Sequence, residues 1–198
     1  MISRRVLLAL GAILPAAGAF SQQPPASGAS PIDPLATRFG GPFTLTDHTG
    51  KRMNDTDFRG RFMLVYFGFT RCTDTCPVDL AIIAQALDAI GPQAERLAPL
   101  FVTVDPAHDT PATMAAYVTA LHPRLIGLTG SESEIAAIAR AYKVHRRKLT
   151  LPHHGAAEYA VDHGSLTYMM DREGRFLTLL PHNAGAPRLA EILNKYLG

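Results

Sequence analysis

The chain has 198 residues, enough for one domain with a sizeable core. Hydrophobic residues make up 47% of it and charged residues 18%, a balance that excludes a disordered chain. The formal net charge is +2, and Arg4 and Arg5 account for the excess. The rest of the chain holds 17 basic and 17 acidic residues. This balance gives no electrostatic reason to expect a nucleic acid as partner.

The first 20 residues have the pattern of an export signal. Arg4 and Arg5 precede an apolar run at 6–14, and the small residues at 17–19 match a signal-peptidase site. The paired arginines also resemble a twin-arginine signal. An uncleaved membrane anchor is the alternative, disfavoured because a spanning helix needs roughly 20 apolar residues. We therefore predict a protein exported to the periplasmic side, soluble or tethered to the inner membrane by an uncleaved leader.

A linker and a short hairpin come next. Residues 21–34 are rich in Pro, Ser, Gly and Ala, which predicts a flexible linker. The folded domain is then expected over 35–198. Within it, 43–46 and 52–53 flank a turn and predict an N-terminal β-hairpin.

Strands and helices alternate through the middle of the chain. Residues 62–67 and 100–104 are continuous apolar runs, typical of strands buried on both faces. Pro77 opens an amphipathic helix that runs to about Ile90. Thr110 is placed as the N-cap of a second helix, which runs from Pro111 to about Leu121.

The last third completes the fold prediction. Residues 131–134 form a capping box that opens a helix with one apolar face, made of Ile135, Ile138, Ala139 and Tyr142. A loop is expected at about 145–160, strands at 165–170 and 175–180, and a final helix at 187–197. This order predicts an α/β fold of the thioredoxin-like kind, with a central mixed sheet flanked by helices.

The chain holds only two cysteines, Cys72 and Cys76, and they directly follow a buried strand. A structural disulfide is the plain alternative, but so short a loop contributes only about 2 kcal/mol. A helix N-terminus stabilises thiolates, and the i, i+4 spacing puts both sulfurs on one side of its first turn. The pair can therefore form a disulfide or bind one metal ion.

Two thiolates are soft ligands, which favours Cu(I) or Zn(II). Structural zinc takes four protein ligands, and no second cysteine pair exists, whereas Cu(I) accepts two or three. A third ligand would be histidine or methionine. His163, directly before a predicted strand, competes here with the adjacent His153 and His154, and it would otherwise be a loop histidine. The other five histidines have no informative context: His48, His108, His122, His145 and His182.

The segment 66–77, Tyr-Phe-Gly-Phe-Thr-Arg-Cys-Thr-Asp-Thr-Cys-Pro, resembles the signature of the Sco/SenC family, exported copper chaperones for cytochrome c oxidase. The resemblance spans roughly 40–180 and continues through the segments 103–106, 109–110, 127–130, 141–144 and 161–163. It implies that Cys72, Cys76 and His163 bind copper, as Cu(I), Cu(II) or both.

One residue departs from the family pattern. Thr73 stands where the family usually has proline, which leaves the loop geometry and the reduction potential of the pair open. Asp74 and Asp105 are expected near the site but outside the ligand set, as a turn residue and a strand-end residue.

The resemblance implies delivery of copper to the binuclear copper site in subunit II of cytochrome c oxidase, with an upstream copper donor and a thiol reductant as further partners. The alternative is a thiol–disulfide oxidoreductase that reduces the acceptor's cysteines. No residue separates these two functions, so whether the protein is an enzyme stays open. A peroxidase is disfavoured because the upstream proline of peroxiredoxins would fall at Phe69 and the chain lacks tryptophan.

Overall fold

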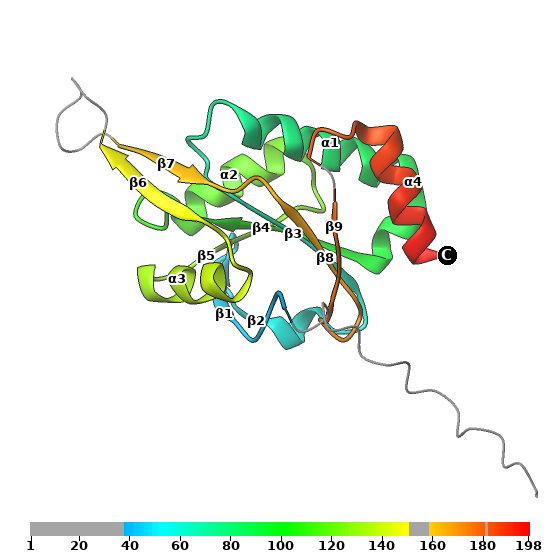
Figure 1. Cartoon of the computed structure of the whole chain (residues 1–198), viewed down its shortest axis with the longest axis horizontal. Helices are drawn as coiled ribbons and strands as arrows, with labels where there is room; N and C mark the ends of the chain where they lie inside the picture. Colours follow the sequence, from blue (N-terminus) through cyan, green and yellow to red (C-terminus); the bar gives the residue numbers. More distant parts are fainter. Residues whose placement is uncertain (1–37, 151–158, 181) are drawn as a thin grey trace, which may run out of the picture. The chain divides into compact units, whose positions relative to one another are not determined.

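The computed structural model describes residues 38–150, 159–180 and 182–198 (Figure 1). The predicted export signal and linker, at 1–20 and 21–34, lie outside these ranges. Within the described part of the chain, no helix combines the length and the apolar character needed to cross a membrane.

A seven-stranded mixed sheet runs in the order β2-β1-β5-β4-β3-β8-β9. Neighbouring strands β3, β4 and β5 are parallel, and every other pairing in this sheet is antiparallel. The strands are β1 Thr44–Asp47, β2 Arg52–Asn54, β3 Phe62–Gly68, β4 Leu97–Thr103, β5 Ile126–Thr129, β8 Thr167–Met170 and β9 Phe176–Leu180. The α/β fold with a central mixed sheet is thereby confirmed.

Helices cover both faces of this sheet because its central strands are apolar on both sides. In β3, Leu64 and Tyr66 pack with residues of α1, α2 and α4, whereas Val65 and Phe67 pack with residues of α3. The helices are α1 Thr75–Ile90, α2 Pro111–Leu121, α3 Glu132–Ala141 and α4 Ala186–Leu197, with 3₁₀ turns η1 Asp55–Phe58 and η2 Gly91–Arg96.

The local signals predicted at the starts of α2 and α3 are confirmed. The backbone N–H of Thr113 donates to the Thr110 side chain at 3.2 Å, which caps α2. At α3, Ser131 and Glu134 form the reciprocal capping box. The predicted apolar face of α3 is buried, with its four residues at most 3% exposed: Ile135, Ile138, Ala139 and Tyr142.

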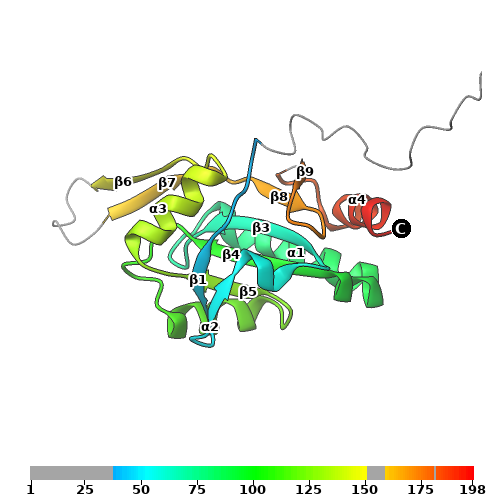
Figure 2. The ribbon, with the colours of Figure 1, turned by 90° about the horizontal axis from the view of Figure 1, so that it is seen from below.

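The loop predicted at 145–160 is wrong at both ends. Two strands form a separate antiparallel sheet here: β6 Arg146–Thr150 and β7 Tyr159–His163 (Figures 1 and 2). We call this two-stranded sheet the ribbon. Its first strand is Arg-Arg-Lys-Leu-Thr. The charged, partly exposed strand lacks the apolar run that marks a buried strand, so the sequence pattern did not show it.

Three further elements differ from their predictions. Strand β5 was not predicted because it is short and contains Gly127, where a Cβ atom would approach Met114 of α2 to 3.1 Å. Strand β4 begins at Leu97, three residues before the predicted start at 100. The prediction began too late because Pro99 normally argues against a central strand. Helix α1 begins two residues before Pro77, which places Cys76 inside its first turn.

Candidate metal centre

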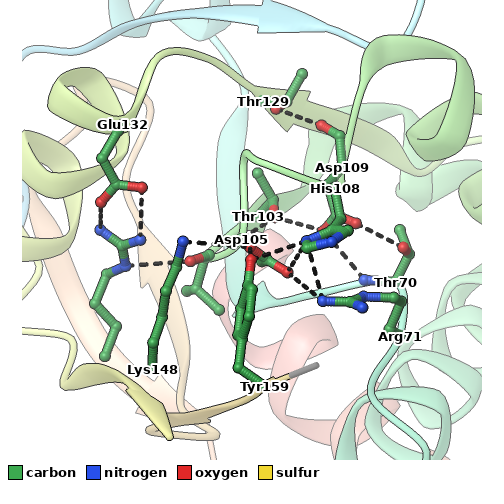
Figure 3. A network of polar contacts seen from close by, with 12 residues as sticks. Thr70, Arg71, Thr103, Asp105, His108, Asp109, Thr129, Glu132, Lys148 and Tyr159 are labelled. Carbon is green, nitrogen blue, oxygen red and sulfur yellow. Dashed lines mark hydrogen bonds and ion pairs between the residues drawn. The ribbon is translucent and has the colours of Figure 1, made fainter. Parts of the chain in front are cut away.

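The two cysteines lie where the parallel strands end, the edge at which open α/β sheets usually place their ligands. Strand β3 ends at Gly68, and the loop 69–74 leads into α1. The buried carboxylate of Asp109 anchors this loop, because the Thr70 N–H and hydroxyl donate to it at 3.1 and 2.6 Å (Figure 3). The Cys72 N–H donates to the Phe69 carbonyl at 3.2 Å. The first half of the cysteine loop is thus fixed by one anchor outside it and by one hydrogen bond within it.

Three soft or borderline donors meet at this loop. One ligand atom each from Cys72, Cys76 and His163 lie within 4.8 Å of one another. Cys76 Sγ is 3.4 Å from His163 Nε2. His163 is the last residue of β7, so the tertiary fold brings it to the cysteines from 87 residues away.

The histidine ring is oriented by its surroundings. His163 Nδ1 is 3.2 Å from the Gly164 carbonyl, a contact in which Nδ1–H donates and leaves the lone pair of Nε2 facing Cys76. The ring meets Phe69 edge-on, with centroids 5.6 Å apart. Burial lowers the pKa of His163 and so favours the neutral imidazole, the form that binds metals.

The two thiols differ in environment. Burial opposes ionisation of Cys72, but the N–H groups of Asp74 and Cys76 outweigh it and lower the pKa of Cys72. Burial first, and then the neighbouring Cys72, raise the pKa of Cys76 to about 12. Thr73 lies exposed between them. Cys72 is therefore the readily ionised sulfur, and Cys76 the protected one.

A buried polar chain lies behind Cys76. Tyr66 packs with Cys76 in the same core cluster, and its hydroxyl donates to Asp79 Oδ2 at 3.1 Å. His182 Nδ1 lies 2.9 Å from the same carboxylate oxygen. Sequence reasoning missed Tyr66 and Asp79. The available signal was an acid three residues after Cys76, on the inner side of an otherwise apolar helix face.

Two of the three donors, Cys72 and His163, line an open cavity of about 570 Å³, whereas Cys76 is buried beside them. Its lining includes Cys72, His163, Arg71, Tyr159 and Ser165. The Ser165 hydroxyl donates to that of Thr75 at 3.2 Å, which joins the chain after β7 to the start of α1. A partner molecule can therefore reach Cys72 and His163 from solvent.

The donor set fits a soft metal ion. Two thiolates and one imidazole suit Cu(I), whereas structural zinc takes four protein ligands. In the part of the chain that the structure describes, this is the only group of three histidine, cysteine or acidic side chains that meets as a ligand cluster.

The other candidate residues lie outside this cluster. Asp74 is exposed at the N-cap position of α1 and lines the cavity, and Asp105 is fully buried in a separate polar network. The rival ligands His153 and His154 lie outside the described residues. The remaining five histidines each bond elsewhere, to Gly127, Asp105, Asp88, Asp162 and Asp79 respectively: His48, His108, His122, His145 and His182.

Comparison with known proteins agrees with this geometry. The SCO1/SenC family model matches residues 33–198. The chain belongs to the SCO1/SenC family. It is 39% identical to the protein sco1 of Schizosaccharomyces pombe over 160 residues, and 41% identical to the human mitochondrial SCO1 homolog over 146 residues. These matches cover 80% and 73% of this chain, but 61% and 48% of the relatives.

Solved structures of the family share the fold. The copper-bound structure of Bradyrhizobium japonicum ScoI superposes with a TM-score of 0.74 at 39% identity, covering 80% of this chain and 99% of that one. This chain spans about half to three-fifths of the length of the two curated relatives, so their full activities and partners do not transfer with the family membership.

Proposed function

We propose that the protein is a copper chaperone that binds copper through Cys72, Cys76 and His163. The observation that carries this proposal is the convergence of these three donors within 4.8 Å, two of which, Cys72 and His163, line an open cavity. An open site suits a cargo ion that must leave again by ligand exchange. The ion, as Cu(I) or Cu(II), is here the substrate rather than a permanent cofactor.

The acceptor that the family resemblance implies is the binuclear copper site in subunit II of cytochrome c oxidase. The exposed side of Cys72 supports direct transfer, because an incoming thiolate can approach through the cavity. An upstream copper donor and a thiol reductant complete the proposed partners.

Copper titration of the reduced protein, followed by absorption and metal analysis, tests the binding. We expect one copper per chain, and affinity losses of about 10–100-fold or more for Cys72→Ser, Cys76→Ser and His163→Ala. His48→Ala is the matched control, because its Nδ1 accepts from the Gly127 N–H and the residue lies on neither ligand-bearing segment. Stoichiometric copper on the double cysteine variant would instead favour His153 and His154.

A second candidate function, a thiol–disulfide oxidoreductase, is supported by the asymmetry of the two thiols. The Cys72 thiolate would attack an acceptor disulfide, break its S–S bond and release one acceptor thiolate, which takes up a proton. Cys76 would then lose its proton and attack the mixed disulfide, forming the Cys72–Cys76 disulfide and releasing the second acceptor thiol. Two electrons pass to the acceptor.

Two parallel assays separate these functions. Reduced protein is incubated with an oxidised, metal-free subunit II fragment, and copper-loaded protein with a reduced fragment. Copper transfer without disulfide reduction supports the chaperone. Rapid reduction without copper, and no transfer, would place the oxidoreductase first.

We also propose that the protein works on the periplasmic side, exported by residues 1–20, as a soluble protein or tethered by an uncleaved leader. Cell fractionation and N-terminal sequencing of the full chain test this. Recovery of the unprocessed protein from the cytoplasm would contradict it.

A further inference from the structure

Among the described residues, no strand pairing joins the ribbon that carries His163 to the main sheet. The ribbon strands β6 and β7 pair with each other, while the cysteines follow β3 of the seven-stranded sheet. Side-chain contacts must therefore place His163 against the sulfurs. Tyr159, Val161 and His163 alternate along β7 and all three line the same cavity. Val161 packs in the core and His163 contacts Cys76, whereas the Tyr159 hydroxyl is engaged in neither contact.

Tyr159 binds a carboxylate that also binds the cysteine loop. Its hydroxyl donates to Asp105 Oδ1 at 2.5 Å. Arg71, the residue before Cys72, donates to Asp105 Oδ2 at 3.1 Å. Asp105 follows β4 and is fully buried, whereas the Arg71 side chain is 41% exposed, so the carboxylate is reached from the protein surface by both donors (Figure 3).

More contacts gather at the same point. His108 Nδ1 lies 3.0 Å from Asp105 Oδ2, and Lys148 Nζ of β6 lies 4.0 Å from Oδ1. The Tyr159 ring receives the Arg71 guanidinium at 5.3 Å and the Lys148 ammonium at 4.7 Å from its centroid. One carboxylate and one phenol thus connect both strands of the ribbon with the cysteine loop.

Resting on the proposed copper site, we propose that Asp105 and Tyr159 are positioning residues that lock the His163 strand to the Cys72 loop. They touch no donor themselves. Their effect on the site passes through His163 on one side and through Arg71 on the other. We call the Tyr159–Asp105–Arg71 contacts the lock. Breaking them would let the His163 imidazole move away from the two sulfurs, which remain fixed on α1 and the loop before it.

Two variants separate the contacts. Tyr159→Phe removes the hydroxyl and keeps the ring that contacts Arg71 and Lys148. Asp105→Asn keeps an oxygen for Tyr159 and removes the charge that Arg71 and Lys148 face. Glu134→Gln is the matched control, since it also breaks an ion pair, with Arg52, but touches neither ligand-bearing segment.

The first measurement needs no metal. In the apo, reduced protein, NMR cross-relaxation between the His163 and Phe69 rings should weaken strongly in Tyr159→Phe and Asp105→Asn, and persist in Glu134→Gln. Unchanged cross-relaxation in both lock variants overturns the proposal. If Asp105→Asn does not fold, Tyr159→Phe alone decides.

The second measurement is Cu(I) affinity by competition with a chromophoric chelator. We expect a loss of about 10–100-fold for Tyr159→Phe, and no further loss when it is added to His163→Ala. An equal loss in both backgrounds overturns the lock, because a merely structural role would not depend on His163. Wild-type protein that binds no copper would refute the proposed function, while the apo measurement would still decide on the lock.

Discussion

Gly68, the last residue of β3, leaves the space that the Cys76 sulfur occupies. A Cβ atom there would lie 2.7 Å from Cys76 Sγ and 2.9 Å from Phe101 Cε2. Both neighbours are fully buried, so neither can move aside without disturbing the core. The requirement for glycine here comes from the close approach of the sulfur, not from backbone conformation.

We therefore expect Gly68→Ala to lower the free energy of unfolding by about 1–3 kcal/mol and to weaken copper binding. Chemical denaturation and copper titration measure the two effects. Gly164→Ala is the control, because that glycine also neighbours a donor but has nothing within 4 Å of the added atom. Equal behaviour of the two variants would contradict the packing argument.

The two thiols should also react at different rates. Cys72 is partly exposed with a lowered pKa, whereas Cys76 is buried with a pKa of about 12. Limited alkylation of the reduced protein near pH 8, read by peptide mass spectrometry, should label Cys72 well before Cys76. Cys72→Ser then leaves a protein that is slow to label. Preferential labelling of Cys76 would contradict the assignment.

At the scale of elements, one residue at the start of α3 both caps the helix and binds it to a strand. Glu134 closes the capping box with Ser131 and also pairs with Arg52 of β2 at 2.5 Å. The hydrogen bond from Arg52, and then that from the Ser131 backbone, lower the pKa of Glu134 to about 2. The helix is thereby attached to the edge of the sheet opposite β9.

This pairing predicts a pH-dependent stability. Because the folded pKa lies below the unfolded value of about 4.3, the contribution is complete above that value and is lost as pH falls toward 2. Glu134→Gln should cost about 1 kcal/mol at pH 7, since Arg52 is half exposed and solvent screens the pair. Chemical denaturation of both proteins at pH 7 and near pH 2 measures this difference in the free energy of unfolding. A cost that stays the same at both values would contradict the linkage.

For the whole molecule, the donors belong to a loop, a helix and a separate ribbon. Binding one ion to all three should stabilise the folded state by about 2.7 kcal/mol when free copper is one hundred times its Kd. Thermal unfolding of the reduced protein with and without Cu(I) measures this gain. His163→Ala should lose most of it, because that variant leaves the ribbon out of the site.

Copper and oxidation should also exclude each other. A disulfide uses the same two sulfurs, so the oxidised protein should bind Cu(I) far more weakly, and Cu(I) should slow oxidation of the pair. Thiol titration over time, with and without copper, tests the second half. Oxidation at the same rate in both samples would show that the sulfurs are not the ligands.

Local chemistry along the chain determined much of this protein. Apolar runs predicted the central strands β3 and β4, and the signals at Thr110 and Ser131 predicted two helix starts, because capping depends on neighbours within one turn. The placement of Cys72 and Cys76 at a helix N-terminus followed from the strand before them and from Pro77 after them. The choice of His163 did not, since a single histidine carries no local signal of metal binding, and it required the resemblance to a family.

Tertiary structure alone decided the rest. It paired the charged strand β6 with β7, extended β4 through Pro99, and buried Asp105 and Asp79 among partners far away in sequence. The burial of the two carboxylates depends on contacts between distant segments, because a buried carboxylate is stabilised only by donors that the fold supplies. The composition of a segment reports its own apolar surface, but it cannot report which side chains from elsewhere will cover it or bind its charges.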